Sequence, residues 1–438
     1  MAANIGLAIR CCVMDTVQVL GQSYRPRVLD GPLHRSLAAA GAVVIEGARA
    51  TGKTMTGLHA AASYAFLDDP EIQQFIEIAP RSVLEGVAPR LLDEWQLSPE
   101  LWNLVRRAVD SSTQQGLFIL TGSAVPADDV TRHTGAGRFL RLRQRTMSWW
   151  EKLEPGVSSV SLATLFDGGF PTPDLDAGPS IDDVISGVLR PGFPALVDLD
   201  IDQSSARLRA YVDEVSRTDI QRLADVRHQP DVIRRLIAAI ARSVASDVAF
   251  TTLTADVRAV APSINAETVS TYVGLLERMF IVEAQQPWTP ALRSRARLRT
   301  AAKLHLVDPA LAAAVLGAGP RQLRNDPTTL GLIFESAVVH DLAVLAAPID
   351  GEVRHYRDSN GKEIDAVVTL PDGRWGAVEV KLGGPQMTTG ATSLRDAVSQ
   401  IDTDAVGEPA FRLVVTGTGP ILTIDDGTVT CPLRALAP

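Results

Sequence analysis

The sequence predicts an α/β fold distributed over several domains. Apolar, β-branched stretches of strand character, "AGAVVIEG" (40–47), "APRLLDEWQ" (88–96) and "GLFILTGSA" (116–124), alternate with helical patterns such as "TMTGLHAAASYA" (54–65). With 438 residues and 46% hydrophobic content, the chain can form about three domains, each with its own core. We therefore expect a multidomain α/β protein.

A glycine-rich loop of the phosphate-binding type joins the first strand to the following helix. Residues 47–54 fit the pattern G-x-x-x-x-G-K-[ST] without a mismatch. The residues expected to surround the phosphates are Gly47, Ala48, Arg49, Ala50, Thr51, Gly52, Lys53 and Thr54. The glycines allow backbone N–H groups at the helix N-terminus to face phosphate oxygens, Lys53 would reach the β and γ oxygens, and the Thr54 hydroxyl would bind Mg²⁺. The motif therefore predicts ATP and Mg²⁺ as cofactors.

Polar side chains follow the next two strands. Asp93 and Glu94 end one strand, an arrangement in which the aspartate holds the water shell of the metal and the glutamate polarises the attacking water. A pair of solvated acidic residues is the structural alternative. The following strand ends at 121–123, and we expect Ser123, with Thr121 as the second choice, to orient the water or to sense the γ-phosphate.

An arginine-rich segment, "TGAGRFLRLRQRTMSWWE" (134–151), follows these strands. Arg138 lies directly after a glycine turn and is the best candidate for an arginine that acts on ATP bound to a neighbouring subunit. The alternative is an ordinary solvated charge on a strand.

Together these motifs resemble those of prokaryotic AAA+ ATPases, with residues 47–54 as Walker A, Asp93-Glu94 as Walker B, Ser123 as sensor 1 and Arg138 in an "AGR" segment. The resemblance covers about residues 24–400 and is closest to a family in which the ATPase core precedes a winged helix and a nuclease-like domain of uncharacterised function. It implies a homo-oligomer, a ring such as a hexamer, with ATP at the subunit interfaces. It does not identify a substrate.

The expected organisation has five parts. They are an N-terminal extension (1–23), the AAA+ P-loop core (24–170), a linker with a helical lid (171–230), a winged-helix domain (231–304) and a C-terminal PD-(D/E)xK, or restriction-endonuclease-like, domain (305–438). Residues 231–288 predict a helix, a short helix, a long helix starting at Asn265, and then a strand pair. That order is typical of a winged helix, a fold that enters a DNA groove or docks a protein.

The densest basic stretch, "LRSRARLRTAAKLH" (292–305), follows the winged-helix pattern. Its period-two spacing would align basic side chains on one face, where they could track a nucleic-acid backbone. The predicted DNA contacts are Arg293, Arg295, Arg297, Arg299 and Lys303. An arginine-rich strand that prevents edge pairing is the alternative.

The C-terminal part contains a helix with Glu335 and two turns, at 359–361 and 371–373, which predict antiparallel hairpins. Asp365 and the pair Glu379-x-Lys381 complete a set that resembles the site of PD-(D/E)xK nucleases, in which carboxylates bind Mg²⁺ and the lysine positions a hydroxide. Such a domain can also persist without cleavage, as a binding or regulatory module.

Composition narrows the function classes. The net charge of −9 excludes a wholly cationic nucleic-acid coat, and three cysteines form no disulfide framework or zinc spacing. A secretory signal pattern and a run of about 18 apolar residues are both missing from the sequence, so we expect a cytoplasmic protein without a membrane partner. The leading hypothesis is a Mg²⁺-dependent ATPase that remodels DNA by translocation, strand separation or branch migration, on branched or single-stranded DNA. The alternatives are an ATP-gated nuclease and a regulatory ATPase that docks a protein.

Overall fold

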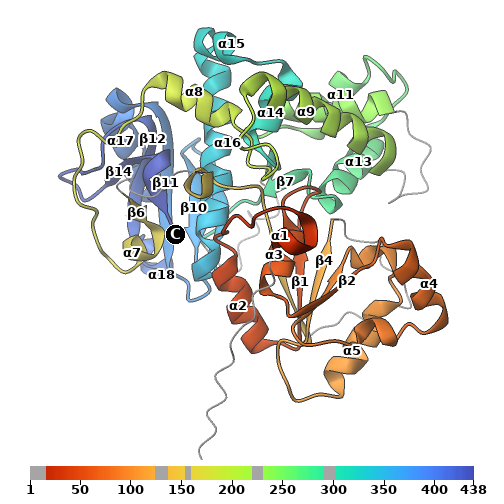
Figure 1. Ribbon diagram of the computed structural model, residues 1–438. Helices are drawn as coiled ribbons and strands as arrows, with labels where there is room; N and C mark the ends of the chain where they lie inside the picture. Colours follow the sequence, from red (N-terminus) through yellow and green to blue (C-terminus); the bar gives the residue numbers. More distant parts are fainter. Residues whose placement is uncertain (1–15, 124–136, 153–158, 220–229, 291–300) are drawn as a thin grey trace, which may run out of the picture. The chain divides into compact units, whose positions relative to one another are not determined.

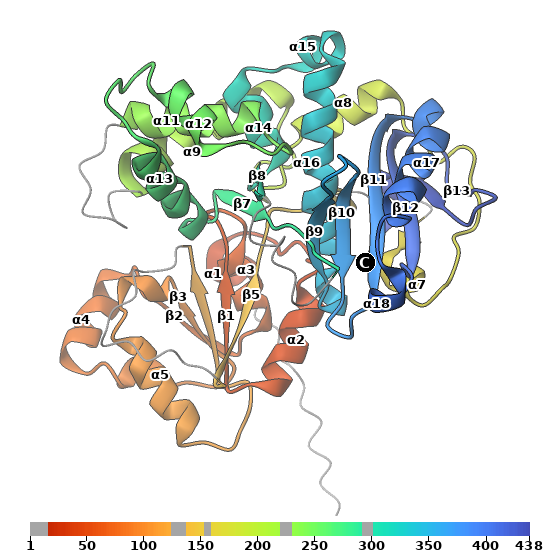
Figure 2. The same ribbon diagram turned by 180° about the vertical axis from the view of Figure 1, so that it is seen from behind.

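The computed structural model describes residues 16–123, 137–152, 159–219, 230–290 and 301–438. The chain divides into two compact units, Met1–Gln144 (unit 1) and Arg145–Pro438 (unit 2). Figures 1 and 2 show the ribbon from opposite sides, and each unit is described separately below.

Unit 1 is built on a parallel five-stranded sheet with the order β2-β3-β4-β1-β5. The strands are β1 (Ala42–Glu46), β2 (Ser63–Phe66), β3 (Arg90–Asp93), β4 (Phe118–Gly122) and β5 (Phe139–Arg143). The helices are α1 (Thr16–Leu20), α2 (Asp30–Ala39), α3 (Lys53–Ala60), α4 (Pro70–Ile78) and α5 (Leu101–Asp110). Because every strand is parallel, all carboxyl ends meet at one edge of the sheet.

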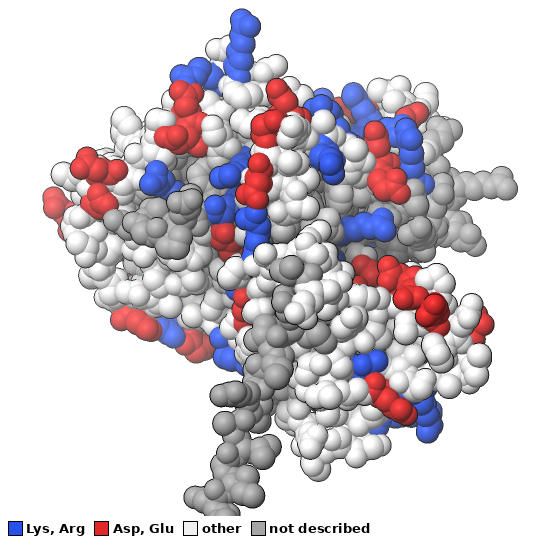
Figure 3. Space-filling view, viewed as in Figure 1, with Lys and Arg blue, Asp and Glu red and all other residues white. Residues whose placement is uncertain are grey.

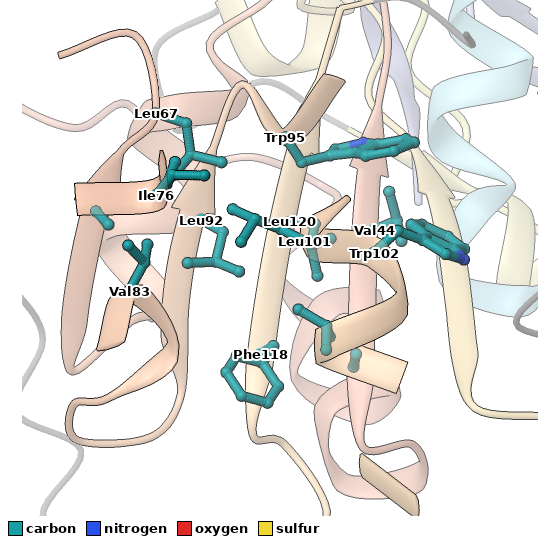
Figure 4. Packing of buried hydrophobic residues seen from close by; sticks show 13 residues of the cluster. Val44, Leu67, Ile76, Val83, Leu92, Trp95, Leu101, Trp102, Phe118 and Leu120 are labelled. Carbon is teal, nitrogen blue, oxygen red and sulfur yellow. The ribbon is translucent and has the colours of Figure 1, made fainter. Parts of the chain in front are cut away.

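Alternating side chains of the sheet enter two separate cores. Val43 and Ile45 pack with residues of α2 and α3, whereas Val44 packs with residues of α4 and α5. Figure 4 shows the core that contains Val44, in which Trp95 and Trp102 lie over the strands. Helices therefore cover both faces of the sheet, as expected for a buried parallel sheet.

The helix expected over 54–65 is shorter than predicted. It ends at Ala60, and Ser63–Phe66 form β2, which pairs with β3. The alanine-rich sequence favours helix locally, but backbone pairing with β3 supplies the hydrogen bonds of this segment instead.

Unit 2 begins with a series of helices. They are α6 (Trp149–Lys152), α7 (Leu162–Phe166), α8 (Ile181–Leu189), α9 (Ile201–Glu214), α11 (Pro230–Arg242), α12 (Phe250–Val257) and α13 (Ala266–Arg278). Of these, α11, α12 and α13 follow the order expected over 231–288. The Asn265 side chain caps α13 by accepting a hydrogen bond from the Thr268 N–H at 2.8 Å, which confirms the predicted helix start. Next, β7 (Val282–Gln285) pairs antiparallel with β8 (Lys303–Leu306).

The rest of unit 2 is a six-stranded mixed sheet with the order β13-β14-β12-β11-β10-β9. Its strands are β9 (Glu352–Arg357), β10 (Glu363–Thr369), β11 (Trp375–Gly383), β12 (Phe411–Thr418), β13 (Leu422–Thr423) and β14 (Val429–Pro432). Its helices include α14 (Pro309–Leu316), α15 (Pro320–Asn325), α16 (Pro327–Leu345), α17 (Met387–Val398) and α18 (Thr403–Val406). In Figures 1 and 2 the sheet lies between α16 and α17.

Both predicted hairpins are confirmed, since β9, β10 and β11 pair antiparallel in succession. Gly361 (φ 79°) and Gly373 (φ 92°) occupy the left-handed region at the turns, where a side chain would be strained. A short parallel pair of β6 (Val160–Ser161) and β15 (Leu436–Ala437) adds to unit 2.

The observed division between units, after Gln144, lies earlier than the expected end of the core at 170. Side chains directly after this point bond within unit 2. Arg145 pairs with Glu283, and the Thr146 hydroxyl lies 2.9 Å from Nε2 of His340. These contacts connect residues about 140–190 positions apart, so sequence patterning alone does not reveal them.

Helix α16 is long and apolar enough, by length and composition, to cross a membrane. In its most apolar window, 67% is buried inside the protein, as in the core helix of a globular domain.

Candidate functional site

The glycine-rich loop connects the carboxyl end of β1 to the N-terminus of α3, as the motif requires. Gly52 (φ 92°) and Ala50 (φ 64°) adopt left-handed backbone conformations at the turn into the helix. A Cβ on Gly47 would lie 2.1 Å from the carbonyl oxygen of Gln144, so only glycine fits there.

Two side chains that sequence reasoning missed hold this loop in place. The carbonyl of Thr51 accepts hydrogen bonds from Nη1 of Arg27 at 2.9 Å and from Nε2 of Gln144 at 3.0 Å. The Thr51 hydroxyl donates to the carbonyl of Ala48 at 2.9 Å. Arg27 and Gln144 are distant in sequence and carry no motif, so no sequence signal identified them.

Lys53 is buried at the first position of α3, and its Nζ donates to the carbonyl of Ala48 at 2.8 Å. Burial lowers the pKa of Lys53 to about 8, although Glu94 and Asp93 favour its charged form. The ammonium group therefore lies within the loop, beside the acidic residues at the end of β3.

The predicted metal residues are in direct contact. The Thr54 hydroxyl donates to Oδ1 and Oδ2 of Asp93 at 2.9 and 3.1 Å, and the Thr121 hydroxyl also donates to Asp93. Burial raises the pKa of Asp93 to about 6, although both threonine hydroxyls oppose this shift. A hydroxyl next to a carboxylate supplies the hard oxygen donors that suit Mg²⁺ together with substrate phosphates, so these residues fit that ion.

Glu94 and Ser123 are neighbours at the same sheet edge. The Ser123 hydroxyl donates to Oε2 of Glu94 at 3.2 Å, and Gln96 bonds to both side chains. The backbone of Glu94 is left-handed (φ 57°), and its N–H donates to the Thr121 hydroxyl at 3.3 Å. Thr121, the second choice from sequence, is thus the residue that contacts Asp93, whereas Ser123 contacts Glu94.

Arg138 lies outside this group of residues in its own unit. It precedes β5, and its carbonyl accepts from the N–H of Ala42 at the amino end of β1. Its Nε pairs with Asp110 at 2.5 Å. The phosphate loop follows the opposite end of β1, roughly 15 Å away for a strand of this length.

The C-terminal carboxylates also come together, within unit 2. Nζ of Lys381 lies 2.6 Å from Oε1 of Glu379, and Oδ2 of Asp365 accepts from the N–H of Val380 at 2.8 Å. Burial, and next the charge of Asp365, raise the pKa of both Glu335 and Glu379. The four residues predicted from the nuclease resemblance therefore form one cluster.

Lys303 belongs to the same cluster, which corrects its predicted role as a surface contact to DNA. It is 6% exposed in β8, and its Nζ lies 2.9 Å from Oε1 of Glu335. The sequence grouped Lys303 with the arginines of the basic stretch, but the packing of β8 directs its side chain inward. The other members of that prediction, Arg293, Arg295, Arg297 and Arg299, lie outside the described residues.

Beside this cluster lies a cavity of about 520 Å³. Glu335 and Lys381 line it together with the polar side chains of Thr328, Gln386 and Thr418. In the part of the chain that the structure describes, no group of three or more His, Cys, Asp and Glu side chains is arranged to hold a metal ion. Glu335 and Glu379 are each paired with a lysine, Lys303 and Lys381, so the C-terminal carboxylates do not fit the divalent ion that the nuclease resemblance implies.

Three family models match the chain. Residues 39–153 match an AAA domain, residues 181–322 match the domain of unknown function DUF8612, and residues 330–436 match the domain of unknown function DUF4143. A search of curated proteins finds no match.

Two solved structures are similar over part of the chain. The Walker-type ATPase PABY2304 of Pyrococcus abyssi has 15% identity and a TM-score of 0.39, covering 67% of this chain and 96% of its own. The FIGL-1 AAA domain in complex with ADP has 13% identity and a TM-score of 0.19, covering 64% and 92%.

The AAA match covers the phosphate loop and the sheet of unit 1, so the chain contains an ATPase domain of the AAA type. The match spans the loop, the end of β3 and the end of β4, where the predicted nucleotide residues lie.

Proposed function

We propose that the protein is a Mg²⁺-dependent AAA+ ATPase that couples ATP hydrolysis to remodelling of DNA. The contact of Thr54 and Thr121 with Asp93, beside the buried Lys53, carries the Mg²⁺ and hydrolysis part of this proposal. In this proposal the groups that bind phosphate and those that bind a metal share one edge of the sheet.

In this proposal the loop N–H groups and Lys53 bind the phosphates of ATP. Thr54 and Asp93 would hold Mg²⁺, which neutralises charge on the phosphate oxygens. Glu94 accepts a proton from the attacking water, and the Ser123 hydroxyl, 3.2 Å from Oε2 of Glu94, holds that carboxylate in position.

Arg138 would act from a neighbouring subunit of a homo-oligomeric ring. The support is its place at the amino edge of the sheet, away from the loop of its own unit. Its partner there, Asp110, is a surface residue whose ion pair contributes little energy and can be exchanged for a phosphate.

DNA as the substrate is supported by unit 2. Helices α11, α12 and α13 followed by the β7–β8 pair have the order of a winged helix, and Glu267, Ser270 and Thr271 of α13 face solvent. On the described residues in Figure 3, basic and acidic side chains are interspersed over the visible face, so binding would depend on local basic residues.

The cluster of Glu335, Asp365, Glu379 and Lys381 does not favour the alternative of an ATP-gated nuclease, because two of its carboxylates are already paired with lysines. A regulatory ATPase whose winged helix docks a protein would share the ATPase unit and lack a response to DNA.

One set of assays separates these functions. ATP hydrolysis is measured with and without Mg²⁺ over duplex, single-stranded and branched DNA, with nicking followed in the same reactions. Lys53→Ala should abolish hydrolysis, and Glu94→Gln should retain ATP without turnover, whereas unchanged hydrolysis in both variants would refute the assigned site. Stimulation by DNA supports remodelling, nicking that Asp365→Ala abolishes supports the nuclease, and no response to any DNA favours the docking function.

A further inference from the structure

Lys303 occupies an unusual position among the C-terminal carboxylates. It is the first residue of β8, its backbone pairs with Gln285 of β7, and its side chain is buried. Its ammonium group contacts Glu335, which belongs to α16 on a separate element. A lysine that is held by a strand at its backbone and by a carboxylate at its tip has little freedom to leave.

The charges of the cluster are nearly balanced by the protein itself. Glu335 pairs with Lys303 and Glu379 pairs with Lys381, at 2.9 and 2.6 Å. Asp365 is the third carboxylate, and it accepts a hydrogen bond from the backbone N–H of Val380. Three carboxylates and two ammonium groups leave a formal charge of about −1, whereas a divalent ion needs several carboxylate oxygens that are free of other cations.

We propose that the Lys303 ammonium takes the place of a divalent cation in the cluster of Glu335, Asp365 and Glu379, and thereby excludes Mg²⁺ and Mn²⁺ from it. This inference is independent of the proposed ATPase function, because every residue involved lies in unit 2. The proposal explains why these carboxylates resemble a metal site although, among the described side chains, no three His, Cys, Asp or Glu residues are arranged to hold a metal ion.

The physical reason is competition for the same lone pairs. An ammonium group 2.9 Å from Oε1 of Glu335 occupies that oxygen and repels a second cation at close range. Removing the ammonium group while keeping an unbranched side chain of similar length would leave Glu335 and Asp365 without that compensating charge. The uncompensated carboxylates should then attract a divalent ion.

The test is binding of Mn²⁺ to the full chain without nucleotide, measured by isothermal titration calorimetry and by electron paramagnetic resonance of free Mn²⁺. Each protein is compared with the same protein carrying Asp365→Asn, and the difference in Mn²⁺ binding between the two is the binding that depends on the C-terminal cluster. This subtraction also removes any Mn²⁺ bound by the P-loop unit. For the wild type this difference should be close to zero. For Lys303→Met the affinity of the Asp365-dependent site should rise by at least about tenfold.

Two control variants separate the effect from a general change of charge. Lys303→Arg keeps the cation and should bind Mn²⁺ no better than the wild type. Lys362→Met removes an exposed lysine that pairs with Asp396 on the surface and should also have no effect. Circular dichroism melting checks folding, and Lys303→Gln replaces Lys303→Met if the latter does not fold.

Two outcomes would overturn the proposal. One is Asp365-dependent Mn²⁺ binding in the wild type that is as tight as in Lys303→Met. The other is a folded Lys303→Met or Lys303→Gln protein that gains no Asp365-dependent binding.

Discussion

Substituting Gly47 with alanine should weaken ATP binding while leaving unit 1 folded. The added Cβ would lie 2.1 Å from the carbonyl oxygen of Gln144, and carbon–oxygen contacts of this kind settle near ~3.3 Å. The loop and the segment that follows β5 must therefore separate by roughly 1.2 Å. Both are backbone, so no flexible side chain can absorb this shift.

The shift acts on the nucleotide site because Gln144 also anchors the loop. Its Nε2 donates to the carbonyl of Thr51 at 3.0 Å, and moving the two apart strains this bond. Overpacking of this kind costs about 1–3 kcal/mol. If the cost falls on the binding-competent loop, Kd for ATP rises about 5- to 150-fold.

The assay is a fluorescence titration with N-methylanthraniloyl-ATP, together with thermal unfolding by circular dichroism. Gly31→Ala is the matched control in the same unit, because its Cβ would meet only Nη1 of Arg35, at 3.7 Å, within α2. That substitution should leave Kd unchanged and slightly raise stability. An unchanged Kd and melting temperature in Gly47→Ala would refute the close approach at Gln144.

Three further expectations concern stability and catalysis. Thr121→Val removes the hydroxyl that donates to Asp93 and should lower kcat more than ATP affinity; an unchanged kcat in steady-state assays would count against this role. Trp102→Ala removes a buried ring that stacks on a neighbouring phenylalanine and should cost about 3–5 kcal/mol in urea unfolding, far more than an exposed-site substitution. Burial lowers the pKa of His305 to about 3 and of His355 to about 4. The neutral, buried rings therefore contribute stability above a pH of about 6.5, and this contribution is lost as pH falls through these values. In His355→Asn the free energy of unfolding, measured with urea between pH 6 and 4, should fall less steeply with decreasing pH.

Features that depend on neighbouring residues could be predicted from the sequence. The phosphate loop lies between a strand and a helix as its motif requires, because 47–54 is a continuous segment with local geometry. The cap at Asn265 and the glycine turns at 361 and 373 are likewise decided within a few residues. The AAA match over 39–153 agrees with this local information.

Contacts between distant segments could not be predicted in this way. The sequence grouped Lys303 with the DNA contacts of the basic stretch, because a run of basic residues does not show which of its members is buried. Packing of β8 directs it to Glu335, 32 positions away. Thr121 reaches Asp93 across 28 positions for the same reason, since strand pairing brings their ends together.

By itself, then, the sequence determined the phosphate loop, the acidic strand end and the hairpins, because each rests on local backbone geometry and short-range periodicity. The tertiary structure alone decided that Arg27 and Gln144 hold the loop, that the first unit ends at Gln144, and that Lys303 lies among carboxylates. These outcomes depend on burial and on long-range pairing, in which segments far apart in the chain compete for the same interior space.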